Sequence, residues 1–116
     1  MDKPEIEFSP VSEVEWTPVD DRCAGLTERI LARVGTSDVA TRILRFAPGT
    51  DTSAIGTMVH DFWEEVYILS GALHDLELGQ TFEAGTYACR PPGMRHGPWT
   101  AVDGCTTFEV RYPAPG

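Results

Sequence analysis

The stretch "GTYACRPPGMRH", from Gly85 to His96, decides the fold assignment of this chain. Five residues separate Gly85 from Pro91, one separates Pro91 from Gly93, and two separate Gly93 from His96. A Pro-Pro-Gly turn restricts the backbone just before His96 and can therefore fix the direction of its imidazole. A metal ligand or a catalytic base needs such positioning, although a histidine that follows a turn could equally be an exposed bystander.

A second stretch, "MVHDFWEEVYILSG" from Met58 to Gly71, places two carboxylates after a histidine. Three residues separate His60 from Glu64, and strand alternation puts Glu64 on the apolar face of the following strand. An unpaired carboxylate buried on that face would be costly, so a cation or a hydrogen-bonding substrate would stabilise it. A register slip of one residue would instead turn Glu65 inward and Glu64 outward.

The rest of the chain has the pattern of short strands joined by turns, with eleven glycines and nine prolines between them. Expected strands cover residues 26–34, 38–46, 64–71, 72–79 and 105–112, although 26–34 also fits a helical stripe. Six to eight strands at roughly 8–12-residue spacing are typical of an all-β barrel or sandwich.

The length of 116 residues fits one domain over 1–116. We expect residues 1–37 to form an N-terminal arm and edge strands, and 38–112 to form the barrel. Prolines at positions 4, 10 and 18 favour an arm that lies along a sheet edge or across a dimer partner.

The net charge of −9 makes nucleic acid and membrane surfaces poor partners, because both are anionic. The N-terminus lacks the apolar segment of a secretory signal, and no apolar run approaches the ~20 residues that span a bilayer. The three cysteines have no C-x-x-C spacing and are expected to be reduced thiols. These features predict a cytoplasmic protein.

The two stretches resemble the two motifs of the cupin superfamily, which are small jelly-roll-like β-barrels with a metal site inside. The second motif is matched at Gly85, Pro91, Gly93 and His96, with Thr100 at the position of its usual asparagine. The first is matched at His60, Glu64 and Gly71, but Met58 stands at its leading histidine and Thr52 at its opening glycine. Residues 40–111 are similar to small cupins grouped with the cupin domain of the ChrR anti-sigma factor. That group includes dioxygenases acting on acetylacetone and on dihydroxyacetophenone.

The resemblance implies that His60, Glu64 and His96 line the barrel, bind a divalent metal and carry the catalysis. Two histidines and one carboxylate suit Fe(II) oxygenases, and Mn, Ni, Zn or Cu are the other candidates. We interpret Met58 as an apolar residue in the space of the absent histidine, although its thioether would suit Cu(I).

Further side chains near the two motifs are candidates for substrate binding: Trp63, Tyr87, Arg90, Trp99 and Glu109. The aromatic residues could form the apolar wall of a pocket, with core packing as the simpler interpretation. Arg90 could hold a carboxylate or a carbonyl oxygen, or form a surface salt bridge. Glu109 could be a buried general base.

These features favour a metal-dependent enzyme that acts on a small organic molecule, most simply a dioxygenase and therefore an oxidoreductase. One alternative is a cupin isomerase, cyclase or dehydratase that uses His60 and Glu64 as acid and base. The other is a non-catalytic sensor of a metal or a ligand. We expect a homodimer, both from the proline-marked arm and from the family resemblance.

Overall fold

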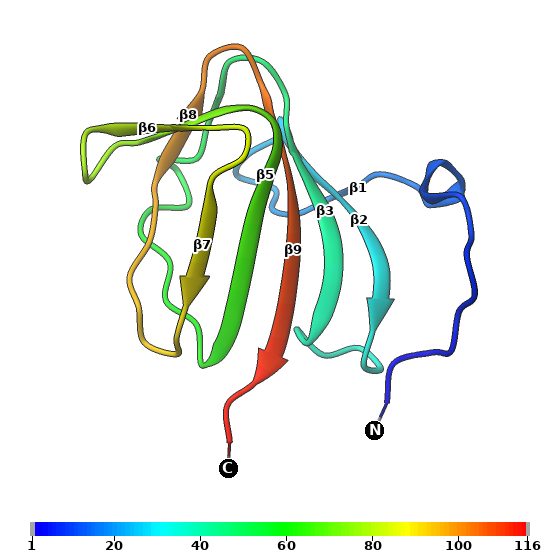
Figure 1. Cartoon of the computed structure of the whole chain (residues 1–116). Helices are drawn as coiled ribbons and strands as arrows, with labels where there is room; N and C mark the ends of the chain where they lie inside the picture. The colour runs from blue at the N-terminus through cyan, green and yellow to red at the C-terminus, as the bar shows by residue number, and fades with distance from the viewer. Residues whose placement is uncertain (1, 116) are drawn as a thin grey trace.

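The computed structural model describes residues 2–115, which form a strongly curled antiparallel sheet (Figure 1). The strands are β1 (Thr17–Pro18), β2 (Leu26–Arg33), β3 (Ala40–Phe46), β4 (Thr50–Asp51), β5 (Phe62–Asp75), β6 (Gln80–Glu83), β7 (Tyr87–Arg90), β8 (Trp99–Ala101) and β9 (Cys105–Pro113). A single turn of 3-10 helix, η1, covers Val11–Glu13. The expected all-β cupin-type architecture is confirmed.

The sheet is organised around β5. Its strand order is β1-β2-β3-β9-β5-β8-β4, and β6 and β7 also pair with β5. The first half of β5 pairs with β7 and β9, whereas its last residues pair with β6 and β8. In Figure 1, β7, β5, β9, β3 and β2 therefore form one wall, and β6 and β8 cross over its upper end. Within residues 2–115, no helix is long and apolar enough to cross a bilayer.

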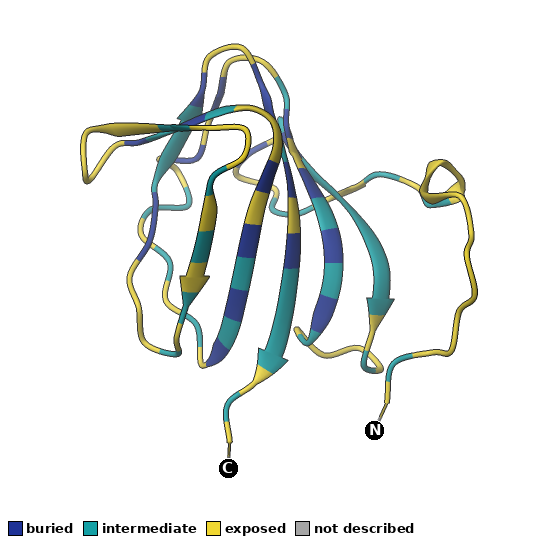
Figure 2. Ribbon diagram, viewed as in Figure 1, coloured by how far each residue is buried: buried dark blue, intermediate teal, exposed yellow. Residues whose placement is uncertain are grey.

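Alternation along β3 and β5 decides which side chains enter the barrel (Figure 2). Every second residue is buried on each strand: Ala40, Arg42, Leu44 and Phe46 on β3, and Phe62, Glu64, Val66 and Ile68 on β5. The register that turns Glu64 inward and leaves Glu65 on the outer face is thus confirmed. The strands expected at 26–34 and 38–46 are present as β2 and β3.

The sequence pattern predicts a strand break at Gly71, but β5 continues through it. Gly71 has a φ of +76°, and a Cβ atom there would lie 2.1 Å from the carbonyl oxygen of Gly104 on the neighbouring segment. The glycine therefore permits a close backbone approach and a change of direction without ending the strand. One strand consequently serves both walls of the barrel.

The inner face has an apolar half and a charged half. The apolar half is a buried core of Cys23, Leu26, Leu44, Phe46, Ile68, Leu73, Ala101 and Cys105. Toward the other end of β3, β5 and β9 the inward positions carry charge, with Glu64 opposite Arg111 and Arg42 opposite Glu109. The candidate site lies in this charged half.

Within residues 2–115, the N-terminal arm forms strand pairs with the sheet only at its last two residues. Thr17 and Pro18 pair with β2, so the expected path along a sheet edge is confirmed for these two residues. The preceding segment stands away from the sheet in Figure 1. Its only side-chain hydrogen bond to the barrel among the described residues joins Lys3 Nζ to Thr41 Oγ1 at 2.8 Å.

Candidate functional site

The loops that carry His60 and His96 are joined by backbone hydrogen bonds. The N–H of Met58 donates to the carbonyl of His96 at 2.8 Å, and the N–H of His96 donates back at 3.0 Å. The N–H of Gly93, in the Pro-Pro-Gly turn, donates to the carbonyl of His60 at 2.8 Å. The turn thus fixes both histidine loops against each other. Because directly paired residues project to the same side of an antiparallel ladder, position 58 lies beside His96.

The two imidazoles converge inside the barrel. Their ring centroids are 4.9 Å apart, and the His60 ring stacks on Phe62 with centroids 4.5 Å apart. Nδ1 of His96 donates to the carbonyl of Met94 at 3.3 Å, which leaves the lone pair on its Nε2. Nε2 of His60 is buried and has no hydrogen-bond partner among residues 2–115.

Burial keeps both histidines neutral. It is the main cause that lowers the pKa of His60, and it lowers the pKa of His96 to about 4, with Arg90 contributing to the second shift. A metal ligand has to be a neutral imidazole, and so does a general base in its resting state. Both chemical roles therefore remain open to this pair.

Glu64 is the centre of the charged half and is only 2% exposed. Its Oε1 accepts a hydrogen bond from Nη1 of Arg90 at 2.8 Å, and its Oε2 accepts one from Nε of Arg111 at 2.7 Å. Nη2 of Arg42 lies 3.9 Å from Oε2. Burial alone would raise the pKa of this carboxyl, but the three guanidinium groups outweigh it and lower the pKa to about 2.

A second ionic group adjoins the first. Nε and Nη2 of Arg42 donate to Oε1 of Glu109 at 3.0 and 2.8 Å, and its Nη1 donates to Glu28 at 3.0 Å. Thr107 donates to the other oxygen of Glu109 at 2.8 Å. Glu109 is thus a buried, fully paired carboxylate.

The donor set fits a metal ion. One ligand atom from each of His60, Glu64 and His96 lies within 4.8 Å of the others. The lone pair on Nε2 of His96 is available to an electron-pair acceptor, and so is that of the unpartnered Nε2 of His60 in the tautomer that carries its proton on Nδ1. A carboxylate has about four lone-pair positions, so Glu64 can accept from two arginines and still coordinate an ion. The same arginines would lower the affinity for a cation through charge repulsion.

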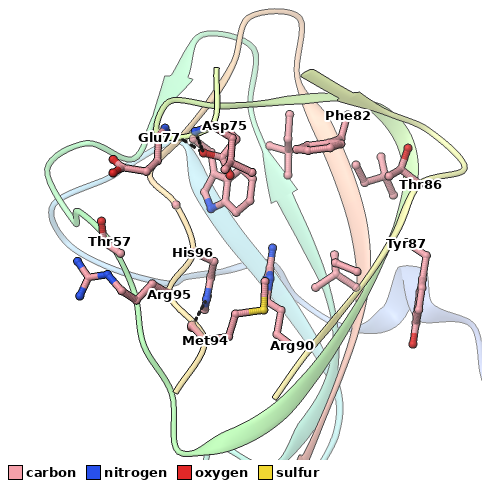
Figure 3. Close-up of a pocket in the computed structure, with 17 residues that line it drawn as sticks. Thr57, Asp75, Glu77, Phe82, Thr86, Tyr87, Arg90, Met94, Arg95 and His96 are labelled. Atoms are coloured by element: carbon pink, nitrogen blue, oxygen red, sulfur yellow. Dashed lines mark hydrogen bonds between the residues drawn. The ribbon is translucent and has the colours of Figure 1, made fainter. Parts of the chain in front are cut away.

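Two cavities that share part of their lining lie beside these side chains. The inner one has a volume of about 90 Å³ and is lined by Met58, His60, Glu64 and the three arginines among others. The outer one, of about 370 Å³, is drawn in Figure 3. Both cavities are lined by Arg90, His96 and Trp99. These residues therefore lie between the candidate metal site and the larger pocket.

The five residues expected to bind substrate separate into two groups. The structure brings four of them to the cavities: Tyr87, Arg90, Trp99 and Glu109. Trp63 alternates with Glu64, so its side chain lies on the outer face, where it stacks on Tyr112 with centroids 6.2 Å apart. Tyr87 also lines the outer cavity, although it is 56% exposed and its hydroxyl hydrogen-bonds to Glu65 on the outer face. Strand alternation thus separates Trp63 from the histidines.

Arg42 and Arg111 are site residues that sequence reasoning did not single out. The sequence does indicate that Arg42 is buried, because alternation places it on the same face as Leu44 and Phe46. An arginine on an otherwise apolar face predicts a buried ion pair. Its partners, however, come from β2 and β9, and a single sequence does not indicate those pairings.

Comparison with known proteins agrees with the fold. Residues 7–114 match the family described as the ChrR Cupin-like domain. No curated protein sequence matches significantly.

Similar solved structures share the fold. An RmlC-like cupin from Shewanella frigidimarina is 21% identical, with a TM-score of 0.73 over 98% of this chain and 96% of the other. An acetylacetone dioxygenase from Acinetobacter johnsonii is 18% identical, with a TM-score of 0.72 over 97% and 76%. The polyketide cyclase RemF from Streptomyces resistomycificus is 18% identical, with a TM-score of 0.70 over 92% and 79%.

Proposed function

Because the chain belongs to the ChrR cupin-like domain family, we propose that it acts on a small organic molecule at a divalent metal held by His60, Glu64 and His96. The observation that carries the proposal is the buried Nε2 of His60, which has no hydrogen-bond partner within residues 2–115. Leaving such an atom unsatisfied costs free energy. A metal bound between His60 and the nearby atoms of Glu64 and His96 would remove that cost.

The simplest reaction for this donor set is a dioxygenation. Two histidines and one carboxylate with open positions suit Fe(II), and Mn, Ni, Zn and Cu are the other candidate ions. When bound, the ion would activate oxygen or polarise the substrate. The structural likeness to the acetylacetone dioxygenase supports this choice at the level of the fold.

The chain's own residues would prepare the site in three ways. The carbonyl of Met94 fixes the tautomer of His96, so that Nε2 faces the cavity with its lone pair. Arg90 and Arg111 hold the Glu64 carboxylate in one orientation. Apolar side chains of the outer cavity, including Phe82 and Trp99, would exclude water from the bound substrate.

A second candidate function is an acid–base reaction without metal, such as an isomerisation, a cyclisation or a dehydration. The observation that favours it is that both oxygens of Glu64 already accept hydrogen bonds from arginines. His60 or His96 would then take the substrate proton as a neutral imidazole. The likeness to a polyketide cyclase supports this alternative at the level of the fold.

Elemental analysis of protein purified without an affinity tag tests the metal site. We expect one divalent ion per chain in the wild type and in His74→Ala, and none in His96→Ala. His74 is the matched control because it pairs with Thr81 on another part of the sheet. A wild type without stoichiometric metal, or a His96→Ala variant that keeps it, would overturn the metal proposal.

Oxygen consumption then separates the reactions. A metal-loaded protein that consumes oxygen with a diketone or a small aromatic substrate would support the dioxygenase. Turnover without oxygen uptake would favour the acid–base alternative. Tight metal binding without any turnover would instead support a sensor.

We also propose that two copies of the chain associate through the N-terminal arm. Phe8 is fully exposed, and Ile6 and Val11 are also exposed large apolar side chains. Burying them against a second copy would contribute about 25 cal/mol for each Å² of apolar surface removed from water. Light scattering coupled to gel filtration should give a dimer mass for the wild type and a lower mass for Phe8→Ser. A monomeric wild type would contradict this assembly.

A further inference from the structure

Arg90 stands at the boundary of the two cavities with part of its guanidinium unused. Its Nη1 donates to Glu64, but its Nε and Nη2 have no hydrogen-bond partner among residues 2–115. Neither nitrogen is among the fully buried unsatisfied atoms, so both reach open space. Figure 3 shows Arg90 beside Met94 and His96 at one end of the outer cavity.

Nε and Nη2 of Arg90 form one edge of its guanidinium, and this edge is suited to binding a carboxylate. In the same protein, Nε and Nη2 of Arg42 both donate to one carboxylate oxygen, that of Glu109. This pair of parallel N–H groups matches a carboxylate in geometry and charge. Arg42 therefore has its carboxylate from the protein, whereas the equivalent edge of Arg90 has no partner among residues 2–115, and Arg90 lines both cavities.

Arg90 shares its carboxylate partner with a second arginine. The carboxylates of Glu28, Glu64 and Glu109 match the three guanidinium groups in number, but Arg90 and Arg111 both pair with Glu64 alone. The positive charge of Arg90 also contributes to the lowered pKa of His96.

Two carboxylates line the outer cavity, but both lie at the opposite end from Arg90 in Figure 3. Oδ1 of Asp75 accepts two hydrogen bonds of 2.9 Å, from the N–H groups of Glu77 and Leu78. Glu77 is exposed at the rim. The end of the cavity beside Arg90 is therefore the one suited to a negative group.

The walls of the outer cavity are suited to an apolar ligand body. They are formed mainly by Val66, Ile68, Leu73, Phe82, Met94 and Trp99. A volume of about 370 Å³ falls at the lower end of the range for small-molecule pockets, roughly 300–1,000 Å³. A single ring or a short alkyl chain would fill it.

We propose that the outer cavity binds a small monocarboxylate, with the carboxylate on the Nε–Nη2 edge of Arg90 and an apolar body between Phe82 and Trp99. The inference rests on the proposed function in one respect, since it names the substrate class of that site. Arg90 is then the residue that selects charged over neutral ligands.

Calorimetric titration of the chelator-treated protein tests the proposal with three acids and their amides. The probes are benzoate, 3-phenylpropionate and octanoate, each paired with its neutral primary amide. For at least one pair, the wild type should bind the acid at least about tenfold tighter than the amide, the loss typical of an unmade charged hydrogen bond. Arg90→Gln should remove this preference while amide affinity changes by less than about twofold.

Two further variants keep the test decisive. Arg90→Lys retains the charge but not the paired N–H groups, and should lose most of the preference if Arg90→Gln proves unstable. Arg45→Gln makes the same charge change at an exposed position on the outer face, and should keep the wild-type preference. Thermal melting of each variant confirms that the folded protein is being titrated.

The outcomes distinguish this inference from the proposed function. Failure of every acid to bind, or an unchanged preference in Arg90→Gln, would overturn the carboxylate site and leave the metal proposal standing. If the protein binds acids through Arg90 but never holds stoichiometric metal, the carboxylate site would be supported and the metal proposal overturned.

Discussion

Arg111 donates a hydrogen bond of 2.7 Å to Glu64, and both side chains come from directly opposed positions on β9 and β5. Arg90 on β7 opposes the same glutamate from the other side, so three neighbouring strands meet at one buried carboxylate. This residue, expected as a metal ligand, is therefore also the main counter-charge of the barrel interior. Its removal should affect stability as well as any metal chemistry.

Glu64→Gln should lower the free energy of unfolding by about 3–5 kcal/mol, because it leaves buried guanidinium groups without their counter-charge. Guanidinium chloride unfolding measures the loss. The matched control is Glu65→Gln, which makes the same change on the outer face and should cost less than about 1 kcal/mol. Equal stability of the two variants would show that the arginines do not depend on Glu64.

Gly71→Ala should be far more damaging than Gly79→Ala. Both glycines have positive φ, +76° and +66°, so both variants introduce backbone strain. Only at Gly71 would the new Cβ meet backbone atoms, whereas nothing lies within 4 Å of it at Gly79. We expect a loss on the order of 1 kcal/mol for Gly79→Ala, and at least about 3 kcal/mol or failure to fold for Gly71→Ala. Denaturant unfolding of both variants checks the difference.

The sequence was most informative where one residue type is physically required. The Pro-Pro-Gly turn before His96 could be identified because proline fixes φ and Gly93 has a positive φ of +85°, a conformation that glycine adopts most readily. Alternation on β5 correctly predicted that Glu64 points inward. The continuous path of β5 through Gly71 could not be predicted, since the glycine's neighbour Gly104 is distant in sequence.

The arginine partners of Glu64 were the least predictable part of the site. Arg90 and Arg111 reach Glu64 only because β7 and β9 both pair with β5 at this register. Single-sequence patterns indicate which residues share a face of one strand, but not which strands become neighbours. Trp63 illustrates the same limit, because it is adjacent to Glu64 in sequence but alternation turns its side chain to the outer face.

Acid should destabilise the metal-free protein in the range where His96 titrates. The pKa of His96 is about 4 in the folded chain and near 6.5 when unfolded, so below about pH 6.5 the unfolded state binds more protons. The free energy of unfolding should therefore fall with pH down to about 4, by roughly 3 kcal/mol at most. His60 acts in the same direction, and Glu64 contributes only below its usual pKa of 4.5.

Denaturant unfolding in chelator at several pH values between about 7 and 4.5 measures this dependence. His96→Gln should flatten the slope, while His74→Gln, which changes a histidine outside the site, should keep the wild-type slope. A wild type whose stability is constant over this range would contradict the buried neutral state of His96.

Met58→His should strengthen metal binding, because position 58 projects beside His96 into the inner cavity. The variant would offer a third imidazole, and each added nitrogen ligand favours Fe(II), Ni(II) or Zn(II) over the thioether it replaces. We expect the dissociation constant for Zn(II), measured by competition with a chromophoric chelator, to fall by at least about tenfold, in line with the effect of single site residues on metal affinity. Val59→His adds the same side chain at a position that is 51% exposed, and should leave the affinity unchanged. Equal affinities for Met58→His and the wild type would mean that position 58 does not face the ligand atoms of His60 and His96.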